Sequence, residues 1–155
     1  MNNDALHPTE LRAWLGFLMA SHLMEHEIER QLKADGGISH GEFEVLFKLS
    51  EADGRRLRMS DLARQAMISK SRLTYQVTQL ERDGLVRRTD CDSDRRAVWA
   101  ELTDKGAEAL ATVRPGHRQV VRDNLISQLS PEELEVFGDL MNRVADRLRE
   151  RRDQR

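Results

Sequence analysis

The segment from Ser60 to Leu102 most constrains the fold of this 155-residue chain, because helical and strand patterns follow one another closely there. Its first part predicts two short helices joined by a tight link at Met67 and Ile68, with Met67 where a turn glycine is often found. Ser60 and Ser69 each precede a helical pattern, where a hydroxyl can accept a hydrogen bond from an unpaired N–H group. Two helices joined by so short a link indicate a helix-turn-helix.

The second predicted helix has an apolar face and a polar face. Leu73, Val77 and Leu80 recur at i, i+4 and i+7, which places them together on a buried side. The other side carries hydroxyls, amides and cations but no acids. This suits the major groove of DNA, where Arg and Gln read base edges while Ser, Thr and Lys reach phosphates. The predicted DNA-binding residues of this helix and its N-cap are Ser69, Lys70, Ser71, Arg72, Thr74, Tyr75, Gln76 and Gln79.

Two strand patterns follow the second helix. Gly84 ends the helix, since glycine readily takes the left-handed conformation found after a helix. Residues 85–89 and 97–102 then predict two short strands, and the polar turn between them predicts a hairpin. Arg95 and Arg96 lie at its tip, where one of them would enter the flanking minor groove of DNA. A helix-turn-helix followed by such a β wing is a winged helix.

Several strings in this segment resemble the MarR family of bacterial transcription regulators. They are L-A-x-x-A-x-I-S from Leu62, L-E-x-x-G-L-V-x-R from Leu80, and D-S-D-R-R-A followed by L-T-x-x-G, which ends at Gly106. The resemblance implies a mainly α fold with a small β hairpin, in which a winged helix-turn-helix DNA-binding lobe joins N- and C-terminal dimerisation helices. We expect one MarR-like domain over 1–155, with the lobe at 36–102 and dimerisation helices at 9–34 and 103–150. The family pattern D-x-R also implies that Asp94 holds Arg96 by a salt bridge.

Charge is distributed unevenly along the chain. From Arg55 to Arg96 there are 11 Lys/Arg and 6 Asp/Glu, whereas the rest of the chain has 14 and 21, within a net charge of −2. A basic centre between acidic ends is typical of a protein that contacts phosphate in one region only. Arg55, Arg56 and Arg58, in a predicted loop over 52–58, could contact phosphate or stay hydrated, and both readings stay open.

Long helical patterns occupy both ends of the chain. A helix predicted from about Glu10 to Lys33 is apolar on more than one side, and a helix that Pro115-Gly116 interrupts or kinks precedes a last one to about Arg149. Helices this long cannot all bury their apolar stripes on one small lobe, so we expect the terminal helices to form a homodimer, as the resemblance also implies. The two-fold axis of a dimer would place two recognition helices in successive major grooves of an inverted-repeat operator.

The resemblance also implies a control mechanism. Family members often bind small aromatic acids or phenols between the dimer helices and the DNA-binding lobe. We therefore expect a regulator of transcription that binds double-stranded DNA, a repressor released by a small aromatic or phenolic effector, with no cofactor. Core packing is the more common role for any single residue at such helical spacing. The predicted effector-binding residues are Trp14, Leu18, His22, Phe43, Phe47 and Met67.

One short motif suggests a different class of protein. His22, Glu25 and His26 match the H-x-x-E-H string of a zinc-peptidase group, and two His at i and i+4 can bind one metal. No further zinc-peptidase signature follows, and a short string recurs by chance, so a zinc-dependent hydrolase is the less favoured alternative. A winged helix used only for protein contacts is the other alternative. We expect no catalytic residues and no metal site, and hence no enzyme.

Cysteine usage and hydropathy indicate the compartment. Cys91 is the only cysteine, so the chain cannot form an internal disulfide, and a reducing cytoplasm is the natural setting. The neighbouring acids Asp90 and Asp92 disfavour a thiolate and hence an oxidation sensor. The N-terminus lacks the pattern of a signal peptide, and no stretch approaches the ~20 apolar residues that span a bilayer. We expect a cytoplasmic protein with no membrane contact.

Overall fold

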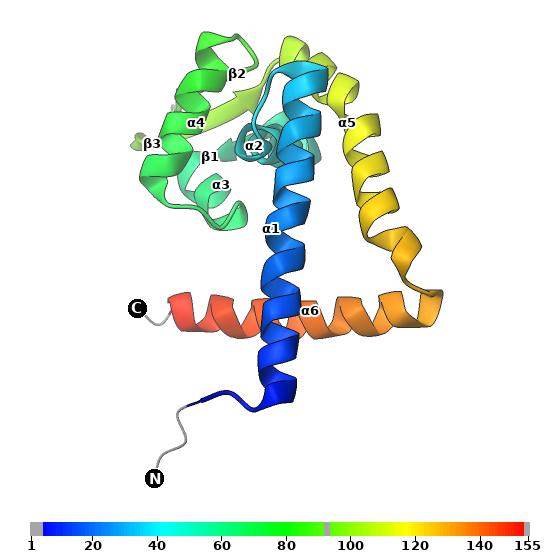
Figure 1. Ribbon diagram of the computed structural model, residues 1–155. Coiled ribbons are helices and arrows are strands. Elements are labelled where there is room, and N and C mark those ends of the chain that lie inside the picture. The colour runs from blue at the N-terminus through cyan, green and yellow to red at the C-terminus, as the bar shows by residue number, and fades with distance from the viewer. Residues whose placement is uncertain (1–4, 92–93, 154–155) are drawn as a thin grey trace. The chain divides into compact units, whose positions relative to one another are not determined.

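The computed structural model describes residues 5–91 and 94–153, with the backbone alone at 91, 94–97, 152 and 153. The chain divides into two compact units, Met1–Arg118 and Gln119–Arg155. The helices of the first unit are α1 (Pro8–Gly36), α2 (His40–Glu51), η1 (Asp53–Arg55), α3 (Met59–Gln65), α4 (Lys70–Arg82) and the greater part of α5 (Asp104–Asn124) (Figure 1). Its strands are β1 (Arg56–Arg58), β2 (Val86–Cys91) and β3 (Asp94–Leu102).

The second unit contains the end of α5, the short helix η2 (Ile126–Gln128) and α6 (Pro131–Asp153). A capping box begins α6, because the Ser130 N–H donates to Glu133 Oε2 (2.8 Å) and the Glu133 N–H donates to Ser130 Oγ (3.2 Å). In the first unit, α5 continues through Pro115, so the helix does not end at the predicted interruption.

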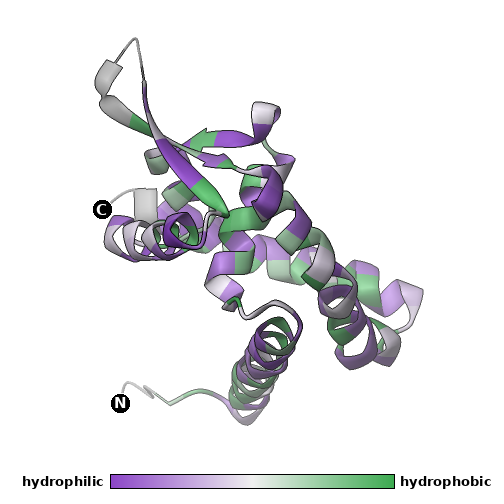
Figure 2. Cartoon of the chain, turned by 90° about the horizontal axis from the view of Figure 1, so that it is seen from above, coloured by the Kyte–Doolittle hydropathy of each residue, from purple (hydrophilic) through white to green (hydrophobic). Residues whose placement is uncertain are grey.

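Only the C-terminal part of α1 contributes to the core. Ile28 and Leu32 are the buried residues of this helix, and its C-terminal half packs against α2 (Figure 1). Hydrophobic segments nonetheless alternate with hydrophilic ones along α1 (Figure 2). Its large exposed apolar residues are Leu11, Trp14, Leu15, Phe17, Met19 and Leu23.

The core of the first unit forms where α2 meets α4 and the sheet. A capping box begins α2, since the Ser39 N–H donates to Glu42 Oε2 (2.7 Å) and the Glu42 N–H donates to Ser39 Oγ (3.2 Å). The buried apolar residues of the lobe include Phe43, Val45, Leu46, Leu49, Leu62, Leu73, Val77, Leu80, Val86, Ala100 and Leu102.

The helix-turn-helix is formed by α3 and α4. Ser69 caps α4 as predicted, because its Oγ accepts a hydrogen bond from the Arg72 N–H (3.2 Å). The N-cap predicted for the first helix is wrong: α3 begins at Met59 with Arg58 as N-cap, because β1 runs directly into the helix. Met67 has a φ of +58°, so a side chain occupies the left-handed turn position where glycine is often found.

The wing is a three-stranded antiparallel sheet in the order β1-β3-β2. The predicted loop over 52–58 is corrected, because Arg56, Leu57 and Arg58 pair with β3. Three residues are too few to show a strand pattern in sequence. The hairpin strands also extend further than predicted, into polar residues whose pairing is set by the ladder rather than by hydropathy. Figure 2 shows the hairpin projecting from the helices of its unit.

Candidate nucleic-acid interface

The exposed side of α4 carries the cations and hydroxyls that the sequence places there. Ser69, Lys70, Ser71, Arg72, Thr74 and Tyr75 are all exposed, and 67% of the Tyr75 surface is accessible. Thr74 Oγ1 donates to the Lys70 carbonyl (2.8 Å), which leaves the oxygen lone pairs available as acceptors. Among the described residues, no carboxylate lies within ion-pair distance of Lys70 or Arg72, so both cations face solvent unpaired. The predicted contact Gln79 is half-buried.

Gln76 departs from the predicted arrangement. The sequence pattern assigned its side chain to the polar face, but only 6% of its surface is accessible. Gln76 lies at i+3 from Leu73 and so falls within the stripe that faces the core. Its placement on the exposed face is therefore corrected, although the position relative to Leu73 puts Gln76 only at the edge of the stripe and does not decide which way it faces. Gln76 Oε1 has no hydrogen-bond partner among the described atoms.

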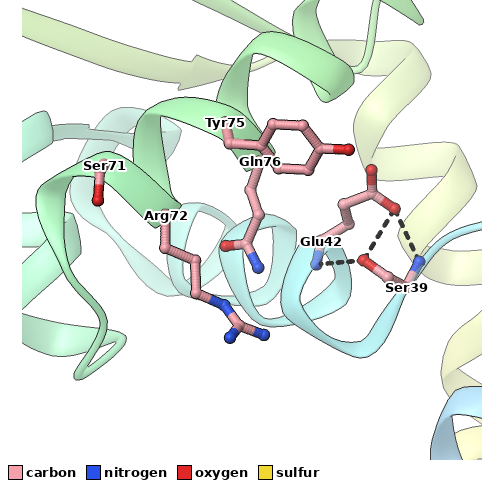
Figure 3. Close-up of a pocket in the computed structure, with 6 residues that line it drawn as sticks. All are labelled: Ser39, Glu42, Ser71, Arg72, Tyr75 and Gln76. Atoms are coloured by element: carbon pink, nitrogen blue, oxygen red, sulfur yellow. Dashed lines mark hydrogen bonds between the residues drawn. The ribbon is translucent and has the colours of Figure 1, made fainter.

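A pocket of about 550 Å³ opens between the start of α2 and the first turns of α4. Its lining residues are Ser39 and Glu42 of α2 with Ser71, Arg72, Tyr75 and Gln76 of α4 (Figure 3). Figure 3 shows the Gln76 side chain directed from α4 toward α2, whereas Ser71 lies nearer the N-terminus of α4. Exposed and buried side chains of α4 therefore line the same pocket, since Ser71, Arg72 and Tyr75 are exposed and Gln76 is buried.

An ion pair connects the end of α4 to the wing. Arg88 of β2 donates to Glu81 Oε2 through Nη2 (2.6 Å) and Nε (3.0 Å), and the Arg88 N–H donates to Glu81 Oε1 (3.0 Å). The side-chain hydrogen bond from Arg88 is the largest cause that holds the pKa of Glu81 below its usual value. These residues are the E and the final R of L-E-x-x-G-L-V-x-R, so the motif includes a clamp between the recognition helix and the wing. The sequence motif contains both Glu81 and Arg88 but did not predict the contact between them.

The L-T-x-x-G string, Leu102 to Gly106, connects the end of β3 and the start of α5 to the residues that follow α4. Thr103 Oγ1 lies 2.8 Å from the Gly84 carbonyl, to which it donates, and it accepts from the Gly106 N–H (3.0 Å). A Cβ at Gly106 would lie 2.0 Å from the Leu85 carbonyl oxygen, so α5 can approach the hairpin this closely only with glycine there. Gly84 has a φ of +74°, as predicted for the residue that follows a helix. These contacts therefore hold Gly84 and Leu85, which connect α4 to β2, against the start of α5.

The predicted wing contacts Arg95 and Arg96 lie on β3. Their side chains, and that of Asp94 with its expected salt bridge, lie outside the described residues, as does the thiol of Cys91.

The structure brings together only part of the predicted effector site. Phe43 is buried and Phe47 half-buried, and their rings stack with centroids 6.2 Å apart. Trp14 and His22 are exposed on α1, where Leu18 is half-buried. Met67 is also exposed, in the turn between α3 and α4, with 42% of its surface accessible.

Two histidines absent from the predicted site join the aromatic pair. The His117 ring of α5 stacks on Phe43 with centroids 4.4 Å apart, and the His40 ring lies 6.3 Å from His117. His40 Nδ1 lies 2.8 Å from Glu25 Oε2 of α1. Burial lowers the pKa of His117, and the charge of His40 lowers it further. Their positions in the sequence gave no signal of this cluster, because its members come from α1, α2 and α5.

The H-x-x-E-H string does not form a metal site in the described part of the chain. His22 and His26 are exposed on α1, and Glu25 pairs with His40. Within residues 5–91 and 94–153, no group of three or more His, Cys, Asp or Glu side chains is placed to hold a metal ion. Nor is any described helix both long and apolar enough to cross a membrane.

The recognition helix, its clamp and the paired strands define the protein as a winged helix-turn-helix. Comparison with known proteins gives the family. The MarR family model matches residues 38–98. The HTH-type transcriptional repressor YetL of Bacillus subtilis is 33% identical over 129 residues, which cover 81% of this chain and 74% of YetL. The chain belongs to the MarR family, and it is a transcriptional regulator with a DNA-binding winged helix.

Two solved structures from Streptomyces coelicolor resemble the chain over almost its whole length. Sco3205, a MarR family regulator crystallised in complex with DNA, is 42% identical with a TM-score of 0.91, covering 93% of this chain and 94% of Sco3205. AbsC, another MarR family regulator, is 41% identical with a TM-score of 0.90, covering 95% of this chain and 99% of AbsC. Transcriptional regulators of this kind are not enzymes.

Proposed function

We propose that the protein represses transcription by binding an inverted-repeat operator through α4 and the wing. The observation that carries this proposal is the exposed side of α4, where Lys70 and Arg72 stand unpaired among hydroxyls and no acid is present. A surface of this composition matches the phosphates and base edges of a major groove. Ser69, Ser71 and Thr74 supply hydroxyls for phosphate, while the exposed Arg72 and Tyr75 supply groups that can reach base edges. Either Arg95 or Arg96 enters the flanking minor groove in this proposal.

A homodimer supplies the two-fold symmetry. The exposed apolar stripe of α1 and a second one on α6 are too large to leave in water. The members of the α6 stripe are Val136, Phe137, Leu140, Val144 and Leu148. Terminal helices that cover these stripes between two chains would place two copies of α4 on one duplex face, about one helical turn apart.

The effector is a small aromatic or phenolic compound in this proposal. The aromatic pair Phe43 and Phe47, with His40 and His117 beside it, offers apolar walls and imidazole hydrogen-bonding groups. Benzoates and phenols are the probes to test. A compound that weakens operator binding should also raise the unfolding temperature of the free protein. The cytoplasm is the proposed site of action.

The test begins with selection of bound fragments from genomic DNA by the purified protein. Fluorescence anisotropy then compares the selected duplex with a scrambled duplex of equal length across a salt series. We expect the selected duplex to bind at least 10³-fold more tightly, at two chains per duplex, with affinity that falls steeply as salt rises. Equal affinity for both duplexes would reject sequence-specific repression. Absence of salt-dependent binding would favour a winged helix that contacts only proteins.

A further inference from the structure

Two arginines stand on the side of the sheet that faces away from the core. In β1, Arg56 and Arg58 are exposed, and Leu57 between them is partly buried. The register pairs Arg56 with Glu101 and Arg58 with Trp99. Residues directly opposite each other in antiparallel strands lie on the same face, so these four side chains share the outer face of the sheet.

Strand β2 extends these cross-strand pairs into two rows of side chains that run across all three strands. Arg87 pairs with Glu101, and Thr89 pairs with Trp99, on the other edge of β3. One cross-strand row therefore reads Arg56-Glu101-Arg87. The adjacent row reads Arg58-Trp99-Thr89. The outer face holds three cations and one acid in these rows.

The guanidinium groups of Arg56 and Arg58 both lie over the indole ring of Trp99. Arg56 Cζ lies 5.0 Å and Arg58 Cζ lies 5.6 Å from the Trp99 ring centroid. Both distances are within the ~6 Å over which a cation is attracted to an aromatic face. Two like charges are thus kept close together on a rigid surface, which reduces the side-chain entropy that an anion would have to remove on binding.

Glu101, the only acid in these two rows, already forms an ion pair with Arg87. Arg87 donates to Glu101 through Nε (3.2 Å) and Nη2 (2.8 Å), a bidentate ion pair. In the part of the chain that the structure describes, neither Arg56 nor Arg58 has a carboxylate within ion-pair distance. Arg58 is therefore available to an external anion, and so is Arg56, whose charge acts on Glu101 without forming an ion pair with it.

We propose that Arg56 and Arg58, held on Trp99, bind the phosphate backbone of DNA next to the segment read by α4 and the wing. This inference rests on the proposed operator binding. Trp99 lies three residues after Arg96 on the same strand. The two rows therefore lie on the strand that also carries the proposed wing contacts, ~10 Å from Arg96 along β3 at about 3.3 Å per residue. Guanidinium groups match phosphate oxygens in geometry and charge.

Single and double alanine variants test this proposal in the full-length protein. We expect Arg56→Ala and Arg58→Ala each to weaken binding about fivefold to tenfold, equally for the operator and the scrambled duplex, because phosphate contacts carry no sequence information. Each loss should lower the slope of log K against log salt by about 0.9. Arg30→Ala is the matched control, since this exposed arginine pairs with Glu27 on α1 and its loss should leave both quantities unchanged.

A tryptophan signal gives a second readout. The chain has two Trp, so Trp14→Phe leaves Trp99 as the sole indole. We expect its emission to change on addition of duplex and to saturate at the concentration found by anisotropy. Unchanged affinity and salt slope in Arg56→Ala/Arg58→Ala, while the wild-type protein binds its operator, would overturn the inference and leave the proposed function intact. A response of Trp99 to poly-glutamate but not to duplex would overturn it in favour of an acidic protein partner.

Discussion

The side-chain amide of Gln76 on α4 fills the space above Gly41 on α2. A Cβ built on Gly41 would lie 1.9 Å from Gln76 Nε2 and 2.9 Å from its Cδ. The recognition helix thus packs on α2 through a glutamine that reaches into the gap left by an absent side chain. This contact sets the face that α4 presents to solvent, because Gln76, with 6% of its surface accessible, cannot turn outward without opening the interface between α4 and α2.

A double-mutant cycle on this pair should show strong coupling. Gly41→Ala alone forces the Gln76 amide to move, and this offsets the gain in helix propensity, so the free energy of unfolding should stay level or fall by about 1 kcal/mol. In a Gln76→Ala background the obstruction is gone, and the same change should stabilise the protein by up to about 1 kcal/mol. Urea unfolding of the four proteins measures the coupling. Additive effects within ~0.5 kcal/mol would show that the two side chains do not interfere.

Gly106→Ala should be strongly destabilising. The new Cβ would meet the Leu85 carbonyl oxygen at 2.0 Å and Leu102 Cδ1 at 2.7 Å, and a backbone atom in the wing cannot rotate aside. We expect a loss of about 2–4 kcal/mol in the free energy of unfolding, measured by urea denaturation. Gly16→Ala is the control, because nothing lies within 4 Å of its added Cβ and alanine favours the helix by about 0.5–1 kcal/mol. Equal stability of Gly106→Ala and the wild type would disprove the close approach of α5 to the hairpin.

The stability of the protein should fall as the pH drops below about 6.5. Burial, aided by the charge of His40, lowers the pKa of His117, so the unfolded chain binds a proton more readily than the folded one in the interval below the ordinary histidine pKa. Stability from this residue is complete above that pKa and is lost as His117 becomes protonated. Urea midpoints at pH 7.5 and 5.5 measure the effect. His117→Gln should show a smaller difference between the two pH values, and an unchanged difference would assign the pH dependence to other groups.

Leu140→Glu should convert the proposed dimer to monomers. A carboxylate in the middle of the exposed apolar stripe of α6 would have to lose its water on association, which costs several kcal/mol. Sedimentation velocity at micromolar concentration measures the change. Asp146→Lys on the opposite side of α6 alters charge by two units while disrupting only an exposed pair with Arg149, and should leave the dimer intact. A dimer that persists in Leu140→Glu would exclude this stripe from the interface.

Substitutions on α4 should separate base reading from phosphate binding. Arg72→Ala should reduce the preference for the operator over a scrambled duplex by about 1–3 kcal/mol, because base-edge contacts carry sequence information. Lys70→Ala should weaken both duplexes alike if it contacts phosphate only. Anisotropy with the two duplexes at fixed salt gives both values. Equal losses for the two duplexes in Arg72→Ala would remove it from base reading.

Much of the winged helix was predictable because its signals are local. The capping box at Ser39, the N-cap at Ser69, the left-handed Gly84 and the apolar positions of α4 each depend on residues within a few positions along the chain. The hairpin was predictable for the same reason. The strand β1 was not, because three residues form a strand only when β3 supplies the hydrogen bonds.

The sequence by itself determined the order and approximate positions of the long helices, the helix-turn-helix and the hairpin, and which helix carries a surface suited to DNA. Only the tertiary structure decided that Gln76 lies inside rather than outside, that Glu81 clamps Arg88, and that Arg56 and Arg58 share the indole of Trp99. The period of a helix locates the centre of its buried stripe, but the width of that stripe depends on the shape of the helix packed against it. Gly41 makes that neighbouring surface hollow, and no pattern within α4 could show it.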